Sequence, residues 1–311
     1  MQKKRSKRII IEGEINEANK KLLDKYTKYM SMKNLSDKTI QNYVYELESW
    51  MRYLDDANAV DQTTEDIEDY VWEMKSLGNN TRRLQFKLST LSAFYKFLKK
   101  RKLVKNNPTE DIDRPSAKNE EIVKPCFLSL EQVKELKKKL SEQDDLQLEV
   151  YINLSLVTLG RINAIRNIKW SDIDWENNMV ENAIEKEGYI VTLFFDDYTK
   201  ELLKRLKNER RRLDIRNKYV FITRYDGKWN QATNATLNNW CKVAGALIGE
   251  EDLHAHSLRK TGSTLLKNAG MPLEDISKLL HHQSTETSLR FYIKQDQSEL
   301  KNSFNQFNPF K

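Results

Sequence analysis

The stretch that decides the fold is residues 254–292, which read HAHSLRKTGSTLLKNAGMPLEDISKLLHHQSTETSLRFY. Near its start, His256 and Arg259 are three residues apart, a spacing that places both side chains on one face of a helix. Near its end, His282 precedes Tyr292 by ten residues. Two interpretations are open at this point. The segment is either an ordinary helix whose tyrosine packs into a core, or a site that holds a nucleophile and its proton-handling partner.

The composition limits the architecture and the class of protein. The 311 residues suggest two domains, because domains commonly contain about 100–200 residues. Hydrophobic residues (39%) allow a packed core, and only 9 glycines and 5 prolines favour a helix-rich protein. No apolar run approaches the ~20 residues of a membrane span, and no signal peptide begins the chain, so we expect no membrane partner. Two cysteines are too few for a disulfide framework, which favours a reducing cytoplasm.

The net charge of +7 and the sequence pI near 9.0 fit a polyanionic partner such as nucleic acid. A well-solvated surface would explain the charge equally well, so charge alone does not separate the two interpretations. The first eight residues, MQKKRSKR, contain five basic side chains. We expect them to form a disordered tail that can lie along phosphates.

The first ~110 residues are expected to be entirely helical. Helices are predicted over residues ~17–31, then after an N-cap at Ser36, after an N-cap at Thr64, and from about Asn80 to Arg101. The inward-facing residues of the fourth helix are predicted to be Leu84, Leu88, Leu91, Tyr95 and Leu98.

Three basic residues are candidates for DNA contact in this first domain. Lys38 lies in the first turn of the second predicted helix, and Arg82 and Arg83 lie in the first turn of the fourth. Cations at helix N-termini oppose the macrodipole, which is easier to understand if phosphates lie nearby. Random surface charge is an equally good explanation for any one of them.

Residues 106–125 contain three of the five prolines, are polar and lack periodicity, so they are the best linker candidate. After them, Ser129 and Gln132 resemble a capping box. The expected elements of the second domain are helices over 130–141, 146–158 and 162–170, a hairpin over 179–195, a loop at 224–234, and mostly helix to about 294.

The chemistry-bearing residues of the second domain suit attack on a phosphodiester. A tyrosine phenol has a pKa near ~10, so Tyr292 needs help to act as a nucleophile. The guanidiniums of Arg161 and Arg259 can clamp phosphoryl oxygens, and Lys186 beside the hairpin turn can protonate a departing oxygen. His256 can accept the tyrosine proton. No metal is implied, because the histidines and carboxylates lack ligand spacing of the H-E-x-x-H type.

Each of these residues alone is a weak signal, since an arginine at a helix start is usually structural. Their order is far more specific, and the set is Arg161, Lys186, His256, Arg259, His282 and Tyr292. This order resembles the tyrosine recombinase (phage integrase) family. Residues 254–292 are similar to the family's block H-x-L-R-x-T, A-G, I-x-x-L-L-G-H and Y, and RINAIRNIKWSDIDW (161–175) resembles its first-arginine block. LSDKTIQNYVYEL and NPTEDI in the first domain resemble its core-type DNA-binding domain.

The resemblance implies a role for each residue. Tyr292 would attack the scissile phosphate, forming a 3′-phosphotyrosyl link and releasing a 5′-hydroxyl. Arg161 and Arg259 would hold the non-bridging oxygens, Lys186 would protonate the leaving oxygen, and His256 would assist acid–base transfer. No ATP, metal or other cofactor would be required, because the covalent link conserves the phosphodiester energy.

The adjacent residues His281 and His282 differ in how they match the family pattern. His282 would hydrogen-bond the phosphate, whereas His281 occupies the position of a family glycine, where a bulky residue would shift the backbone or offer a rival contact. The family places its tyrosine nine or ten residues further on, at Phe291 or Tyr292, and only Tyr292 has a hydroxyl.

Two further departures concern the first arginine. The family usually has glycine two residues before it, but here the order is Leu159-Gly160. The family often has a supporting Glu or Asp three residues after it, and here that residue is Ala164. The loss of this carboxylate would slow catalysis or be compensated by Asn163. Since no chemistry-bearing group is lost, we expect an active enzyme.

The fold implied is mainly α: a helical SAM-like core-binding domain, and a mixed, mostly helical catalytic domain with a small antiparallel sheet, forming a C-shaped clamp on DNA. The expected boundaries are 1–16 basic tail, 17–111 DNA-binding domain, 112–126 linker, 127–295 catalytic domain and 296–311 tail. In that tail Leu300, Phe304 and Phe307 form an apolar stripe, which would dock on its own domain or on a neighbouring protomer.

The partners implied are double-stranded DNA at a specific site, a homotetramer on that DNA, and accessory DNA-bending or host proteins, in the cytoplasm at the nucleoid. The recombinase would be an integrase of a virus or mobile element, or a Xer-like resolvase. Two alternatives stay open: a strand-passing enzyme like type IB topoisomerases, and a catalytically silent DNA-binding regulator with the same fold.

Overall fold

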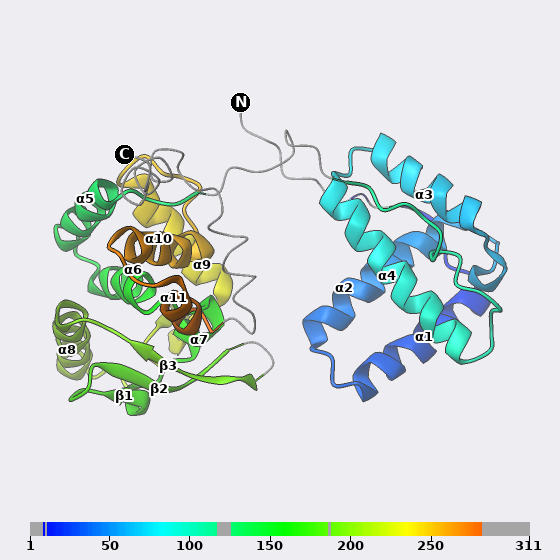
Figure 1. The fold of residues 1–311 in the computed structure, drawn as a ribbon. Coiled ribbons are helices and arrows are strands. Elements are labelled where there is room, and N and C mark those ends of the chain that lie inside the picture. The colour runs from blue at the N-terminus through cyan, green and yellow to red at the C-terminus, as the bar shows by residue number, and fades with distance from the viewer. Residues whose placement is uncertain (1–8, 10, 117–125, 186–187, 282–311) are drawn as a thin grey trace, which may run out of the picture. The chain divides into compact units, whose positions relative to one another are not determined.

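The chain divides into two compact units, Met1–Lys124 and Pro125–Lys311. The computed structural model describes residues 9, 11–116, 126–185 and 188–281. Each unit has its own hydrophobic core, and helices dominate both (Figure 1). The predicted mainly α class, with a small antiparallel sheet in the second unit, is confirmed. Within the described ranges, no helix combines the length and apolarity needed to cross a membrane.

The described part of the first unit contains four α-helices and one short 3₁₀ turn. These are α1 (Glu17–Met32), α2 (Asp37–Tyr53), η1 (Ala59–Asp61), α3 (Thr64–Ser76) and α4 (Thr81–Lys100). Side chains of Asn16, Ser36, Thr63 and Asn80 accept hydrogen bonds from the first turns of the four α-helices. The N-cap predicted at Thr64 is therefore wrong by one residue, because Thr63 forms a reciprocal capping box with Asp66.

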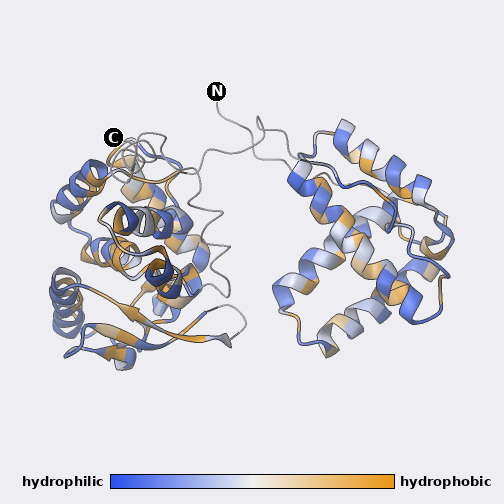
Figure 2. Cartoon of the chain, in the orientation of Figure 1, coloured by the Kyte–Doolittle hydropathy of each residue, from blue (hydrophilic) through white to orange (hydrophobic). Residues whose placement is uncertain are grey.

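The amphipathic faces of these helices meet in one core. The residues predicted to face inward on α4 (Leu84, Leu88, Leu91, Tyr95 and Leu98) are all buried. Trp50 and Tyr70 fill the centre with their rings 4.9 Å apart. Figure 2 shows bands of hydrophilic and hydrophobic residues along each helix, as expected for helices with one buried face.

The second unit has more elements, which surround one largely buried helix. They are α5 (Leu130–Ser141), α6 (Leu146–Thr158), α7 (Ile162–Asn167), η3 (Trp170–Asp172), β1 (Ile173–Asp174), β2 (Met179–Ile184), β3 (Ile190–Phe194), α8 (Asp197–Arg212), β4 (Ile222–Tyr225), β5 (Lys228–Gln231), α9 (Asn234–Ala246), α10 (Ala255–Asn268) and α11 (Leu273–Leu279). Helix α6 is apolar on nearly all sides and packs against α5, α8, α9 and α10. It is therefore the central helix of this core.

The strands form one three-stranded antiparallel sheet, in the order β1-β2-β3, and a separate β4-β5 hairpin. Val180 pairs with Leu193 on the buried face of the first sheet. The hairpin predicted over 179–195 is confirmed as β2-β3. The loop predicted over 224–234 is wrong in part, because Asp226-Gly227, both at positive φ, turn the chain between β4 and β5.

The helix predicted over 162–170 is also shorter than expected. The helix ends at Asn167, and the residues that follow it pair with the segment at residues 218–219. Lys169 forms a β-bridge with Tyr219, and the Trp170 N–H donates to the Lys218 carbonyl at 3.0 Å. These tertiary hydrogen bonds replace the helical ones that the sequence pattern alone would favour.

Candidate active site

Helix α10 positions the H-x-x-R pair, as the spacing predicted. His256 and Arg259 both lie in its first turns, His256 accessible at the surface and Arg259 buried. The helix packs tightly on α6 at Gly262, where an added Cβ would lie 2.1 Å from the Leu156 carbonyl oxygen. Only glycine permits this approach, so α6 fixes the position of Arg259 one turn earlier on the same helix.

Backbone carbonyls from two different segments hold the Arg259 guanidinium. Its Nη1 donates to the Leu159 carbonyl at 2.5 Å, and its Nη2 donates to the Leu280 carbonyl. Leu159 caps α6 and Leu280 caps α11. At the C-terminal ends of two helices, carbonyl groups without a partner in the helix itself therefore bind one buried cation. A cation is favourable there because the C-terminal end of a helix carries a partial negative charge.

The swapped order Leu159-Gly160 has a structural explanation. Leu159 adopts the left-handed conformation (φ 54°), which glycine would occupy without strain, and its side chain packs against Ile276 and Leu280. A Cβ at Gly160 would lie 2.6 Å from Ile165 Cδ1, so a larger residue there would require the Ile165 side chain to shift. The leucine thus accepts backbone strain while its carbonyl binds Arg259.

Arg161 is the N-cap of α7 and is the more accessible of the two arginines. Its backbone is extended, and its side chain is 36% exposed. Partial burial lowers the pKa of its guanidinium. Its Nη1 forms an ion pair with the Glu185 carboxylate. One face of this cation is therefore held by protein, while the side chain still reaches solvent.

Glu185 lies at the centre of the described part of the site and is not among the residues predicted from the sequence. Its side chain is only 2% exposed. Its Oε1 lies 3.6 Å from Arg259 Nη1 and 3.7 Å from His281 Nδ1, while its Oε2 pairs with Arg161. The available signal was an acidic residue at the end of an apolar strand, directly before Lys186.

The structure also shows what surrounds Ala164. Ala164 is fully buried, and its neighbour Asn163 accepts a 2.7 Å hydrogen bond from Asn234 on α9. Compensation by Asn163 stays a prediction, and the carboxylate that pairs with Arg161 comes from Glu185. An anionic partner is thus present, on the hairpin and not on α7.

His281 follows α11 in a left-handed conformation, with φ 47°. Its N–H donates to the Lys278 carbonyl at 2.9 Å, so it takes the position after a helix end where glycine is favoured. Burial and the cations Arg259 and Arg161 lower the pKa of its imidazole. The prediction that a bulky residue here offers another contact agrees with its approach to Glu185.

His256 has an environment that favours the neutral imidazole. Partial desolvation is the largest cause that lowers its pKa, followed by the charges of Arg259, His254, Lys260 and Arg161. Since the unperturbed pKa is 6.5, His256 is mainly neutral at pH 7 and able to accept a proton. The predicted site residues Lys186, His282 and Tyr292 lie outside the described residues.

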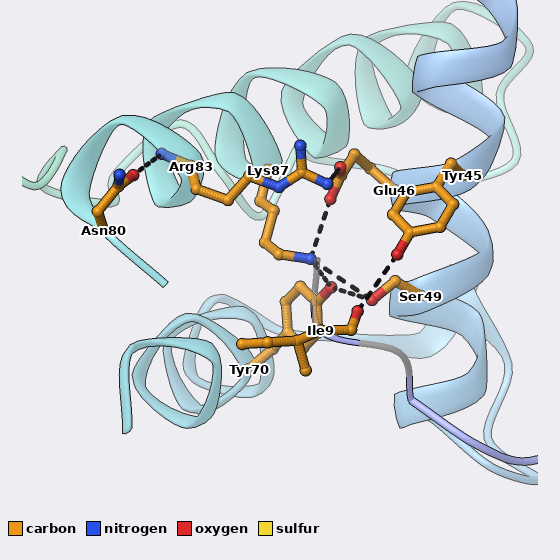
Figure 3. A network of polar contacts seen from close by, with 8 residues as sticks. All are labelled: Ile9, Tyr45, Glu46, Ser49, Tyr70, Asn80, Arg83 and Lys87. Atoms are coloured by element: carbon orange, nitrogen blue, oxygen red, sulfur yellow. Dashed lines mark hydrogen bonds and ion pairs between the residues drawn. The ribbon is translucent and has the colours of Figure 1, made fainter. Parts of the chain in front are cut away.

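The three basic candidates of the first unit differ from one another. Lys38 and Arg82 are exposed, whereas Arg83 pairs with the buried carboxylate of Glu46. Figure 3 shows that Glu46 also pairs with the buried Lys87, at 2.9 Å. Arg83 therefore has a structural partner, which the prediction of DNA contact did not anticipate. DNA contact by all three residues stays a prediction.

The Lys87 ammonium connects three helices of the first unit (Figure 3). It donates to Tyr70 Oη on α3 at 2.9 Å and lies 3.4 Å from Ser49 Oγ on α2. Tyr70 and Ser49 are themselves 3.0 Å apart. These contacts offset part of the desolvation cost of burying the Lys87 ammonium.

Comparison with known proteins identifies the family. The phage integrase family model matches residues 126–299, and the model of the phage integrase N-terminal SAM-like domain matches residues 23–102. The chain belongs to the phage integrase family. It is therefore a tyrosine recombinase, an enzyme of site-specific recombination, as the resemblance implied.

Relatives of this recombinase cover almost its whole length. It is 27% identical over 305 residues to tyrosine recombinase XerC of Bacillus pumilus (strain SAFR-032), covering 93% of this chain and 96% of that one. It is 22% identical over 290 residues to a tyrosine recombinase of Thermosipho africanus (strain TCF52B), covering 90% and 97%.

Solved structures share the fold of this recombinase. The Tn1549 transposon integrase in complex with transposon right end DNA has a TM-score of 0.73 at 14% identity, covering 94% of this chain and 99% of that one. XerH bound to palindromic difH substrate has a TM-score of 0.72 at 18% identity, covering 91% and 83%. At these identities the likeness concerns the fold.

Proposed function

We propose that this recombinase cleaves and rejoins double-stranded DNA through a 3′-phosphotyrosyl link to Tyr292. The observation that carries the proposal is the convergence of Arg161 and Arg259, from separate helices, on one carboxylate. Two guanidiniums gathered at one point are a suitable clamp for an anion such as a phosphodiester. The accessible side chain of Arg161 allows such an anion to approach from solvent.

The proposed reaction exchanges one phosphoester for another. Tyr292 Oη attacks the phosphorus, the bond to the 5′-oxygen breaks, and Lys186 supplies the proton that makes the 5′-hydroxyl. Negative charge grows on the non-bridging oxygens in the transition state, where Arg161 and Arg259 bind it. The reverse attack by a 5′-hydroxyl from a second strand rejoins the DNA and restores the phenol.

Proton transfer assigns the remaining roles. The lowered pKa of His256 keeps its imidazole neutral at pH 7, so it can take the proton of the attacking tyrosine. His282 is proposed to hydrogen-bond the phosphate. No step requires the protein to supply a cofactor, because the phosphotyrosyl link retains the energy of the broken phosphodiester.

The partners are also proposed from chemistry and from likeness. The +7 net charge suits duplex DNA, and exposed Lys38 and Arg82 are suitable phosphate contacts. Several proteins with this fold were solved bound to DNA, including XerH on its difH substrate and a lambda integrase dimer on a COC' core site. We propose a homotetramer that exchanges strands between two duplexes, assisted by DNA-bending or host proteins, at DNA in the cytoplasm.

The test is covalent capture from a pool of nicked duplexes with randomised sequence. A nick close to the cleavage point lets the 5′-hydroxyl fragment diffuse away, so a phosphotyrosyl adduct accumulates and its DNA can be sequenced. The wild-type chain should enrich one family of sites, and Tyr292→Phe should give no adduct, whereas the matched control Phe291→Leu should retain it. Specific DNA binding without any adduct would instead support a silent regulator.

A further inference from the structure

The side chain of Glu185, just after β2 in the β2-β3 hairpin, contacts the two arginines of the site. Glu185 directly follows β2, and its N–H donates to the Tyr189 carbonyl at 2.8 Å, which closes the hairpin. Its carboxylate is buried at the same time. The residue is thus fixed at both ends, through its backbone in the hairpin and through its side chain among the arginines.

The contacts of this carboxylate join three other segments to the hairpin. Arg161 comes from the start of α7, Arg259 from α10, and His281 from the end of α11. Arg259 is itself only 5% exposed, so a nearby negative charge lowers the cost of burying its cation. The carboxylate therefore sets the distance between two cations that would otherwise repel each other.

The position along the chain adds a second consequence. Lys186 is the next residue after Glu185. Any movement of Glu185 moves the backbone from which Lys186 extends.

We propose that Glu185 is a positioning residue for strand cleavage. It aligns the guanidiniums of Arg161 and Arg259 with each other, and it anchors the hairpin that carries Lys186. Its side chain is only 2% exposed, so it acts through the two arginines and not by contact with the DNA. This inference rests on the proposed function of the arginines and lysine.

The test compares Glu185→Gln with Glu181→Gln in the full-length chain. Glu181 lies on β2, four residues before Glu185, and is exposed, so it controls for the loss of one negative charge from this part of the hairpin. The probe is a nicked duplex selected with the wild-type enzyme, and two quantities are measured: the affinity for that DNA and the cleavage rate at saturating DNA. Glu185→Asp is the conservative variant, with the same charge on a side chain shorter by one methylene.

We expect Glu185→Gln to lower the saturated cleavage rate on the order of 10²-fold, the effect of a ~1 Å misplacement, with DNA affinity changed by less than about 3-fold. Glu185→Asp should recover part of that rate, and Glu181→Gln should match the wild type. Should Glu185→Gln fail to fold, Glu185→Asp decides the question, with an expected loss of at least about 10-fold.

Three results would overturn the proposal. The first is a wild-type rate in Glu185→Gln, or in Glu185→Asp where that variant alone can be measured. The second is a loss of DNA affinity that accounts for the whole loss of rate. The third is a loss as large in Glu181→Gln. An absent adduct in the wild type would instead refute the proposed function, so the two failures are distinguishable.

Discussion

The close contact between α6 and α10 gives the prediction that joins packing to catalysis most directly. In Gly262→Ala the new Cβ would lie 2.1 Å from the Leu156 carbonyl oxygen and 2.5 Å from Leu159 Cδ2. An ordinary contact at this position begins at 3.4 Å, so the helices would have to separate by about 1.3 Å. The Arg259 to Leu159 hydrogen bond, at 2.5 Å, would be broken by such a shift.

The magnitude follows from two opposing effects. Overpacking of this severity costs about 3 kcal/mol. Alanine is favoured over glycine in a helix by about 1 kcal/mol, which leaves a net loss of about 2 kcal/mol. For a unit of this size that corresponds to a fall in Tm of roughly 4–8 °C. Because Arg259 moves with α10, the cleavage rate should fall on the order of 10²-fold.

The assay is differential scanning calorimetry, followed by single-turnover cleavage below the lowered Tm. Asn268→Ala is the matched control, because it raises helix propensity at an exposed position near the end of the same helix. A Gly262→Ala chain as stable and as active as the wild type would show that α6 does not fix Arg259, and the reasoning would be refuted.

Three further predictions concern backbone strain, a buried ion pair and pH. His281→Gly should be more stable than His281→Ala by about 1 kcal/mol in urea unfolding, since only glycine removes the strain at φ 47°; equal stabilities would contradict this. Lys87→Met should cost about 3–5 kcal/mol by leaving Glu46 buried with less compensation, and Glu46→Leu added to it should recover much of the loss; a single-variant cost under about 1 kcal/mol would disprove it. The pKa values of His256 and His281 are lowered in the folded state, so the unfolded chain gains protons first as pH falls below 6.5, and the free energy of unfolding should drop. His256→Gln should reduce the change in the urea midpoint between pH 7 and pH 5. A change in midpoint equal to that of the wild type would count against the effect.

The sequence was a good guide where a local pattern decides the structure. The apolar spacing of α4 predicted its buried face, and the start of α5 followed from its capping box. The H-x-x-R spacing placed His256 and Arg259 on one helix. In each case the interacting groups are separated by only three or four residues, so one period of the helix determines the outcome.

Long-range contacts were the ones that the sequence could not predict. Helix α7 ends early because Trp170 binds the Lys218 carbonyl, and no pattern near residue 167 contains that information. Glu185 meets Arg259 across 74 positions of the chain, through an ion pair that no local sequence pattern contains. The family pattern predicts a carboxylate at the position of Ala164, whereas the carboxylate that pairs with Arg161 in the structure is that of Glu185.

The second domain contains the order of chemistry-bearing residues, from Arg161 to Tyr292, that resembles the tyrosine recombinase family. Helix ends, not only side chains, complete its site, because the carbonyls of Leu159 and Leu280 bind Arg259. Gly262, which has no side-chain chemistry of its own, is required for the close packing of α10 on α6. The site therefore depends on backbone carbonyl groups and on close helix packing as well as on catalytic side chains.

The most direct test of the central claim is to locate the covalent bond between protein and DNA. The wild-type chain would be trapped on its selected nicked duplex, digested with protease and nuclease, and sequenced by tandem mass spectrometry. The account predicts one nucleotide-bearing peptide, modified on Tyr292 through a 3′-phosphate. A modification on any other residue, or an adduct that persists in Tyr292→Phe, would contradict it.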